Sequence, residues 1–345
     1  MTPLPRTTTR RRLLFGGSAA LGLLLTGCGD DTGASRAAEG GGATPESTGP
    51  WEFTDDRGTK ISLPRRPQRI VAQVHAAAAL WDFGVRPVGV FGPQKGPDGA
   101  KDPQLGNVDP GAVTSVGASF GEFHLEQYAA LKPDLVVTIM YGSALWYVPT
   151  ESQSKIESLA PIVGIKLDGV SADKAIERFG ALAASLGADL AAPSVTQARS
   201  EFDAASERVR QAARDKAGLR VAVTIGQEEG FWVADPAFHG DVKYFQSLGV
   251  DVVAPARPNP AFGFEQLSWE KADTYPADLL LEDARALGMT SDQLAAKFPT
   301  WKLLPAVKAG QVAPWRAETP SSYQQYAKVL GELADTIAKS RTDVV

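Results

Sequence analysis

The chain has 345 residues, 43% of them hydrophobic and 22% charged, which is the composition of an ordinary globular protein large enough for two domains. Its formal net charge is −5, and the first 27 residues carry four arginines and no acid, so the remainder has 31 basic and 40 acidic residues, a balance of −9. This acidity argues against a nucleic-acid-binding protein, which needs a basic stripe.

The N-terminus is typical of a bacterial export signal. Arg10 to Arg12 form a charged, twin-arginine-like segment, and the apolar run Leu13 to Leu25 is too short to span a bilayer. Leu25-Thr26-Gly27-Cys28 then resembles a lipobox, in which the chain is cut before the cysteine and the thioether is diacylated. We therefore expect a signal peptide over 1–27 and lipidation at Cys28, while the twin-arginine and general export routes stay open. Cys28 is the only cysteine, so an intramolecular disulfide is excluded.

Residues 28–49 are rich in Gly, Ser, Thr, Ala and Pro, a composition that cannot bury enough surface to fold. We expect a flexible tether with an r.m.s. reach of roughly 25 Å. The next residues, Trp51 to Leu63, alternate apolar and polar around an Asp-Arg-Gly turn, which predicts a β-hairpin.

The rest of the chain reads as two similar halves. Each runs strand, helix, Gly-Val turn, strand, Glu-headed helix, Pro, Asp, strand, and Glu126 precedes Asp134 by the same eight residues that separate Glu270 from Asp278. Between the halves, Ser171 to Gly187 has apolar residues at helical spacing. We expect an N-terminal α/β lobe over 50–168, a single long connecting helix over 169–190 and a C-terminal α/β lobe over 191–345. A crossover helix within one sheet is the alternative.

Five segments follow one another in a characteristic order: PQRIVA from Pro67, FGVRPVGV from Phe83, LEQYAALKPDLVVTI from Leu125, LAPIVGI from Leu159 and WKLLPAVKAGQV from Trp301. In this order they resemble the periplasmic binding proteins of ABC importers for ferric siderophores and cobalamin. The resemblance implies two Rossmann-like lobes joined by one long helix, a ligand cleft between them, and a monomer that carries no cofactor and catalyses no reaction.

The same resemblance gives a role to two glutamates. In that family, a surface glutamate on each lobe pairs with arginines of the permease dimer, which works with its ATPase. By position, Glu126 and Glu270 are the docking residues, and Glu122, Glu265 and Glu282 are alternatives. Each of the first two could instead only stabilise the start of a helix.

Ligand residues follow from the topology, because ligands of open α/β sheets bind beyond the carboxyl ends of the parallel strands. Aromatic and polar side chains cluster after the predicted strands, and they are His75, Tyr141, Trp146, Tyr147, Phe231, Trp232, Arg257, Trp315 and Arg316. Each aromatic residue taken singly could be a core residue, above all Phe91 and Phe262. Together they predict an aromatic pocket with a few polar groups.

The few basic residues at these positions favour one kind of ligand. A ferric tris-catecholate is strongly negative and calls for several arginines or lysines, whereas a ferric hydroxamate is neutral or weakly charged and rich in carbon. We expect a ferric hydroxamate, with Arg257 or Arg316 near a hydroxamate oxygen. Cobalamin and haem stay open.

The sequence leaves two further interpretations open. His75, His124 and His239 with carboxylates could hold zinc or manganese. Gly117 to Gly121 matches G-x-S-x-G, so Ser119 could be a hydrolase nucleophile, but the preceding residues 113–116 are too polar for a core strand. No glycine-rich phosphate loop occurs, so the chain is not expected to be an ATPase.

Overall fold

The computed structural model describes residues 49–96, 99–285 and 288–345. The expected signal peptide 1–27, the lipidation site Cys28 and the tether up to residue 48 therefore lie outside the described residues. Within the described ranges, no helix is both long and apolar enough to cross a membrane.

The first described element is the expected hairpin, in which β1 (Trp51–Thr54) pairs antiparallel with β2 (Lys60–Leu63). The carboxylate of Asp55 organises the turn, because it accepts hydrogen bonds from the backbone N–H groups of Arg57 and Thr59, both at 3.0 Å. The prediction of a hairpin here is confirmed.

A mainly parallel sheet forms the centre of the first half. Its strands have the order β5-β4-β3-β6, β8 also pairs with β6, and the short β7 is antiparallel to β6. Val136 of β6 pairs with both Val71 of β3 and Ile162 of β8, so β6 lies between those strands. The elements are β3 (Ile70–Gln73), α1 (Val74–Asp82), β4 (Gly89–Phe91), β5 (Thr114–Ser115), α2 (Leu125–Ala130), β6 (Leu135–Tyr141), β7 (Ala144–Leu145), α3 (Thr150–Leu159) and β8 (Ile162–Lys166).

The second half repeats this arrangement. Val221 of β9 pairs with Val252 of β11 and with Leu279 of β13, and β14 pairs with the far edge of β13. An antiparallel pair, β10 and β12, extends the sheet beside β9. The elements are β9 (Arg220–Gln227), β10 (Gly230–Ala234), α6 (Gly240–Ser247), β11 (Asp251–Val252), β12 (Phe264–Leu267), β13 (Leu279–Asp283), α7 (Ser291–Lys297), α8 (Pro305–Lys308), β14 (Val312–Trp315) and α9 (Tyr323–Lys339).

The predicted duplication is visible in the strand order. In the first half β3 lies between β4 and β6, with β8 beyond β6, and in the second half β9 lies between β11 and β13, with β14 beyond β13. The first half has one further parallel strand, β5, beside β4. The two Glu-headed helices differ, however. Glu126 lies in the first turn of α2, whereas Glu270 lies in a short 3-10 helix, Trp269–Lys271, rather than in an α-helix.

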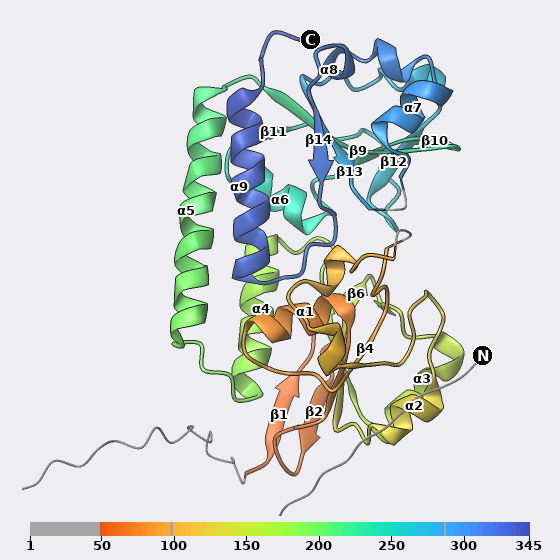
Figure 1. Cartoon of the computed structure of the whole chain (residues 1–345), viewed down its shortest axis with the longest axis vertical. Helices are drawn as coiled ribbons and strands as arrows, with labels where there is room; N and C mark the ends of the chain where they lie inside the picture. The colour runs from red at the N-terminus through yellow and green to blue at the C-terminus, as the bar shows by residue number, and fades with distance from the viewer. Residues whose placement is uncertain (1–48, 97–98, 286–287) are drawn as a thin grey trace, which may run out of the picture. The chain divides into compact units, whose positions relative to one another are not determined.

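The connection between the sheets contains two helices, α4 (Ala172–Ser185) and α5 (Pro193–Asp215), where the sequence led us to expect one. The expected helix over 169–190 is α4, which packs against α1 of the first half and α6 of the second. The longer α5 leads into β9 and lies beside α9 (Figure 1). The sequence analysis assigned the connection to the periodic segment Ser171 to Gly187 alone and did not identify α5 as a second helix.

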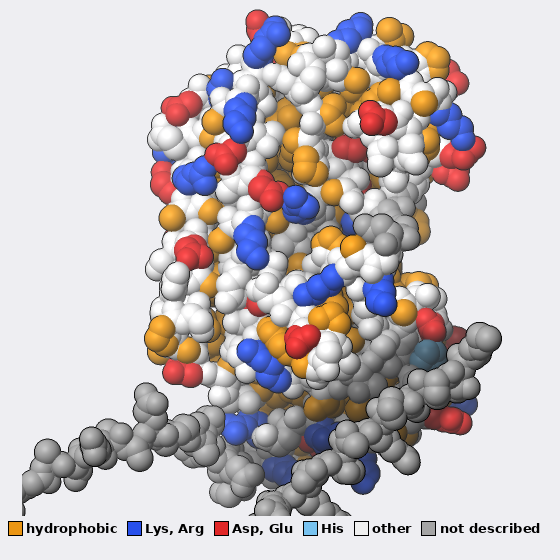
Figure 2. Space-filling model, in the orientation of Figure 1, with side chains coloured by type: hydrophobic (Ala, Val, Ile, Leu, Met, Phe, Trp, Pro, Cys, Tyr) orange, Lys and Arg blue, Asp and Glu red, His pale blue; other side chains and the backbone are white. Residues whose placement is uncertain are grey.

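Contacts between the halves are extensive among the described residues. Leu80 of α1, Phe179 of α4 and Val223 of β9 belong to one continuous buried hydrophobic cluster. The hydroxyl group of Ser322, at the start of α9, also donates to Asp82 of α1 across 2.6 Å. The exposed face over α5 and α9 carries interspersed acidic and basic side chains (Figure 2).

Candidate ligand-binding site

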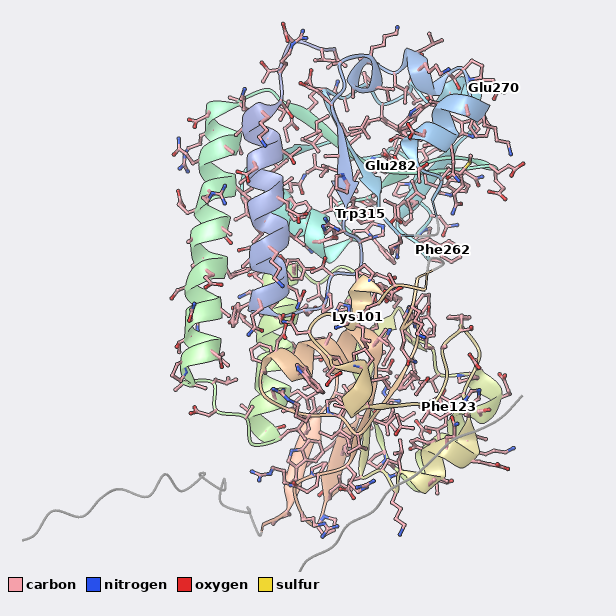
Figure 3. The ribbon with its side chains drawn as sticks, in the orientation of Figure 1. Lys101, Phe123, Phe262, Glu270, Glu282 and Trp315 are labelled. Atoms are coloured by element: carbon pink, nitrogen blue, oxygen red, sulfur yellow. The ribbon has the colours of Figure 1, made fainter. Side chains whose placement is uncertain are left out.

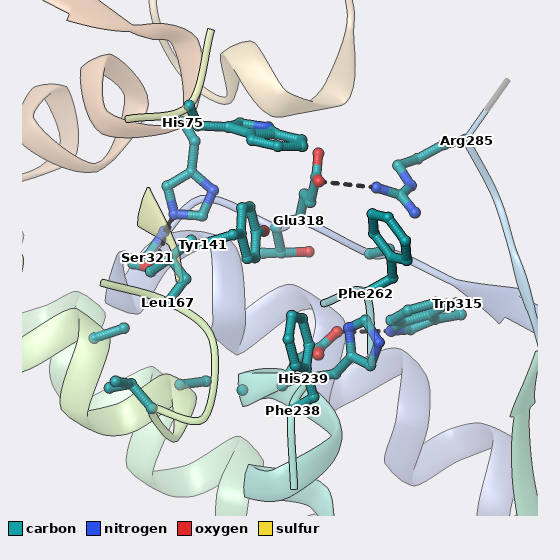
Figure 4. Close-up of a pocket in the computed structure, with 18 of the residues that line it drawn as sticks. His75, Tyr141, Leu167, Phe238, His239, Phe262, Arg285, Trp315, Glu318 and Ser321 are labelled. Atoms are coloured by element: carbon teal, nitrogen blue, oxygen red, sulfur yellow. Dashed lines mark hydrogen bonds and ion pairs between the residues drawn. The ribbon is translucent and has the colours of Figure 1, made fainter. Parts of the chain in front are cut away.

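A cavity of about 430 Å³ is lined by residues from both halves. His75 and Tyr141 come from the carboxyl ends of β3 and β6, and Trp315 and Arg285 come from the ends of β14 and β13 (Figure 4). The cavity therefore lies beyond the carboxyl ends of the parallel strands, where the sequence predicted a ligand site.

Four of the nine predicted ligand residues line this cavity, namely His75, Tyr141, Trp146 and Trp315. Tyr147 does not line it but packs edge-on against Trp146, with ring centroids 6.0 Å apart. Phe231 is buried in a separate core with Trp269 and Trp301, so the structure removes it from the candidate site.

The remaining three predicted residues lie in neighbouring hollows. Trp232 and Arg257 line a groove of about 580 Å³ that shares Phe262 and Phe264 with the cavity. Arg316 lines a third hollow, together with Lys101, and its guanidinium pairs with Glu332 across 2.6 Å. Neither arginine predicted to neutralise a ligand oxygen therefore lines the cavity itself.

The basic side chain that does line the cavity is Arg285, two residues after β13. Its guanidinium binds Asp283 through two nitrogens, with a closest distance of 2.6 Å, and its third nitrogen lies 3.0 Å from Glu318. Burial works to lower the pKa of Arg285, but the charges of Glu318 and Asp283 raise it above its ordinary value. Burial raises the pKa of Glu318, against the opposing effect of Arg285. Arg285 also follows the carboxyl end of a parallel strand, so the rule that predicted the other ligand residues applies to it as well.

His75 is 1% exposed and joins the two halves. Its Nε2 accepts a hydrogen bond from the backbone N–H of Ser321 across 3.1 Å, so the proton of the neutral ring is on Nδ1. This Nδ1 has no hydrogen-bond partner among the described residues. Burial lowers the pKa of His75 to about 4, against a smaller opposing effect of the Glu318 backbone, so the ring is neutral at pH 7.

The opposite wall is aromatic. The ring of His239 lies 4.4 Å from that of Phe264 and 5.5 Å from that of Trp315, and burial lowers the pKa of His239 to about 4. The indole N–H of Trp315 donates to the buried carboxylate of Asp241 across 2.6 Å. Moving the indole would leave the buried carboxylate of Asp241 without this donor, which costs free energy, so the bond holds the Trp315 ring in place.

Two phenylalanines that we considered as core residues behave differently. Phe91 is fully buried, as expected, and packs against Phe123. Phe262 is 66% exposed and lines the cavity, so the core assignment is wrong for this residue. In Figure 3 it lies where the two halves approach each other.

The structure gives the metal reading no support. Within the described ranges, no three His, Cys, Asp or Glu side chains form a group that could hold a metal ion. His75 and His239 bind the backbone of Ser321 and Gly263, and His124 lies 2.8 Å from Glu122.

The G-x-S-x-G stretch is an exposed loop between β5 and α2. Its strand has two residues, and the backbone N–H of Ser119 donates to the carboxylate of Glu122 across 2.9 Å. Ser119 therefore lacks the buried strand and sharp turn that present a hydrolase nucleophile.

The five candidate docking glutamates fall into two groups. Glu126 and Glu270 are exposed, and Figure 3 shows Glu270 at the margin of the second half. Glu122 is half-buried, and its carboxylate accepts a hydrogen bond from the backbone N–H of Ala118 in its own loop. Glu265 and Glu282 are each 6% exposed and hydrogen-bonded inside the protein, so neither is a surface residue.

Comparison with known proteins agrees with this architecture. Residues 71–319 match the periplasmic binding protein family, and the chain belongs to that family. It is similar to DesE, a ferric-siderophore receptor protein from Streptomyces coelicolor, with 40% identity, a TM-score of 0.79, and coverage of 85% of this chain and 99% of that one. The sequence-based resemblance is confirmed. A comparison with curated proteins gives no match.

More distant structures share the fold. The siderophore periplasmic binding protein from the fuscachelin gene cluster of Thermobifida fusca has 24% identity and a TM-score of 0.54, with 79% of this chain and 97% of that one covered. FhuD2 from Staphylococcus aureus, with bound ferrioxamine B, has 16% identity and a TM-score of 0.54, with 79% and 98% covered.

Proposed function

We propose that this protein captures a ferric siderophore, preferably of the hydroxamate type, and delivers it to the permease of an ABC importer. The observation that carries the proposal is the cavity between β-strand ends of both halves, with Tyr141, Trp146 and Trp315 in its walls. The similarity to DesE, a ferric-siderophore receptor, supports the same ligand class. No catalytic step belongs to this function.

The charges of the cavity favour hydroxamates over catecholates. Arg285 is the only Lys or Arg among the described residues that line it, and it is already paired with Asp283 and Glu318. A strongly negative ferric tris-catecholate would also meet the carboxylates of Asp241 and Glu318. A neutral ferric hydroxamate avoids this repulsion and can pack its hydrocarbon chains against the aromatic walls. Cobalamin or haem is the alternative ligand, since flat rings suit the same walls.

The permease partner follows from the family and from two exposed carboxylates. We assign docking on the permease dimer to Glu126 and Glu270, one from each half. Both are solvent-exposed, as an intermolecular ion pair requires.

The N-terminal residues suit a protein held at the outer face of the cell membrane. A signal peptide over 1–27 would be removed, lipid would attach to Cys28, and residues 28–49 would serve as a tether for a monomeric binding unit. We further infer modest closure on ligand binding, because the Asp82–Ser322 hydrogen bond and the continuous core join the halves.

Titration of the purified protein tests the ligand class. Trp146 and Trp315 line the cavity, so a bound ferric hydroxamate should quench tryptophan fluorescence at micromolar or lower concentrations, while a ferric catecholate should not. Mass spectrometry and visible absorbance of protein isolated from iron-starved cells should then identify the natural ligand. Quenching by catecholates alone, or a co-purified corrinoid or haem, would contradict the proposal.

A further inference from the structure

Phe120 is a large apolar side chain that is 69% exposed, although the loop that carries it is firmly held. The carboxylate of Glu122 accepts hydrogen bonds from the backbone N–H groups of Ala118 and Ser119, both at 2.9 Å. The exposure of Phe120 is therefore a fixed feature of the fold.

The position of Gly117 reinforces this constraint. Its φ is 151°, and a Cβ added there would lie 2.3 Å from the carbonyl oxygen of Glu122, so a larger residue would displace the loop. The backbone N–H of Gly92 also donates to the Gly117 carbonyl across 3.1 Å. The loop thus holds Phe120 in a defined place at the surface.

Phe120 continues the aromatic wall of the cavity. Its ring centroid lies 5.2 Å from that of Trp146 and 5.3 Å from that of Tyr147, both in edge-to-face geometry. Trp146 in turn lies 5.0 Å from Tyr141, and both of these residues line the cavity. An unbroken series of ring contacts therefore runs from the cavity wall to the exposed ring.

We propose that Phe120, Trp146 and Tyr147 form a rim subsite for the hydrocarbon linker of the bound ligand, where that linker leaves the cavity. The inference rests on the proposed function and extends it to ligands with long methylene linkers. Pockets of this size class leave roughly 10–30% of a ligand's surface outside. Contact with that part removes apolar surface of Phe120 from water, which favours binding.

Two features favour the ligand over the permease as the occupant. The rings that Phe120 touches belong to the cavity wall or adjoin it, so Phe120 lies within reach of a linker that crosses Trp146. The carboxylate of the nearby Glu122, in contrast, is engaged with its own loop and with His124 at 2.8 Å.

Two ligands and one substitution test the subsite. The first ligand is a linear ferric trishydroxamate with methylene linkers, and the second is the ferric tris-acetohydroxamate complex, which has none. Phe120→Ala should weaken binding of the first about tenfold, mainly through faster dissociation, and binding of the second less than about twofold. Leu303→Ala is the matched control, because Leu303 is 62% exposed but does not line the cavity, and both affinities should stay unchanged. Thermal unfolding checks that both variants fold.

The outcomes separate the alternatives. An equal effect of Phe120→Ala on both ligands, or no effect on either, would overturn the subsite while leaving the proposed function intact. Unchanged affinity combined with reduced uptake in cells would assign Phe120 to the permease contact and also overturn it. Failure of the unaltered protein to bind any ferric hydroxamate would overturn the proposed function, and the subsite with it.

Discussion

The backbone N–H of Ser321 donates a hydrogen bond to Nε2 of His75, and the two residues are 246 positions apart. The bond links the start of α1 to the segment that precedes α9, and it fixes the histidine as the neutral Nδ1–H form. A buried ring that must stay neutral makes the contact between the halves sensitive to acid.

This relationship predicts loss of stability at low pH. Burial lowers the pKa of His75 from 6.5 to about 4, so the folded state binds its proton less readily than the unfolded state does. The stability that comes from keeping His75 neutral is fully present above pH 6.5 and is lost as the pH falls to about 4. This loss is on the order of 3 kcal/mol in the free energy of unfolding. Urea unfolding at pH 7.5, 5.5 and 4.5 measures it. His75→Gln keeps an acceptor for Ser321 and should flatten the slope, while a variant of the exposed His124 should not.

For Glu282 we expect the opposite dependence of stability on pH. Its carboxylate accepts hydrogen bonds from the Thr224 hydroxyl and the Gly226 N–H, both at 2.6 Å, and burial raises its pKa from 4.5 to about 7. The protonated form is the one that the fold favours, so the contribution of Glu282 to stability is largest below pH 4.5 and declines as the pH rises through 7. Glu282→Gln should therefore stabilise the protein at pH 8 by about 1–3 kcal/mol and have little effect at pH 4.5.

The control for this prediction is Glu126→Gln, which alters an exposed carboxylate of the first half. Its effect on the free energy of unfolding should stay within about 0.5 kcal/mol at both pH values. A stabilising effect of Glu282→Gln that does not change between pH 4.5 and 8 would contradict the assignment.

The ion pairs of Arg285 should contribute more to stability than an exposed pair does. Arg285→Met leaves the fully buried Asp283 carboxylate and the mostly buried Glu318 without a cation, which should cost about 3–5 kcal/mol in urea unfolding. Adding Glu318→Gln to this variant should restore part of the loss. Arg316→Met removes the exposed pair with Glu332 and should cost less than about 1 kcal/mol. Equal losses for the two arginine variants would show that burial of the Arg285 cluster has no energetic consequence.

The sequence predicted the position of the cavity better than the side chains that line it. His75, Tyr141 and Trp315 line it because the carboxyl ends of parallel strands meet at one edge of a sheet, and Trp146 follows Tyr141 by five residues. Alternation along a strand explains one error, since Phe231 and Trp232 on β10 point to opposite faces and Phe231 faces the core.

Other features depend on tertiary structure that no local pattern encodes. Glu318 lies in a loop at φ 57° and meets Arg285 only after the second half has folded. The second helix of the connection was predictable, however. Phe202, Ala205, Val209 and Ala212 of α5 are buried at three- and four-residue spacing, the same signal that identified α4.

The docking residues predict a separation of binding from transport. Glu126→Arg and Glu270→Arg place like charges against the arginines of the proposed permease partner, and such repulsion costs several kcal/mol at an interface. Each variant should keep the siderophore affinity of the purified protein, because neither residue lines the cavity. Uptake of iron by cells that carry either variant should fall at least about tenfold, and further for the double variant. Glu151→Arg is the matched control, since Glu151 is also exposed in the first turn of a helix, α3, and uptake should stay normal. Normal uptake in the double variant would remove Glu126 and Glu270 from the permease contact.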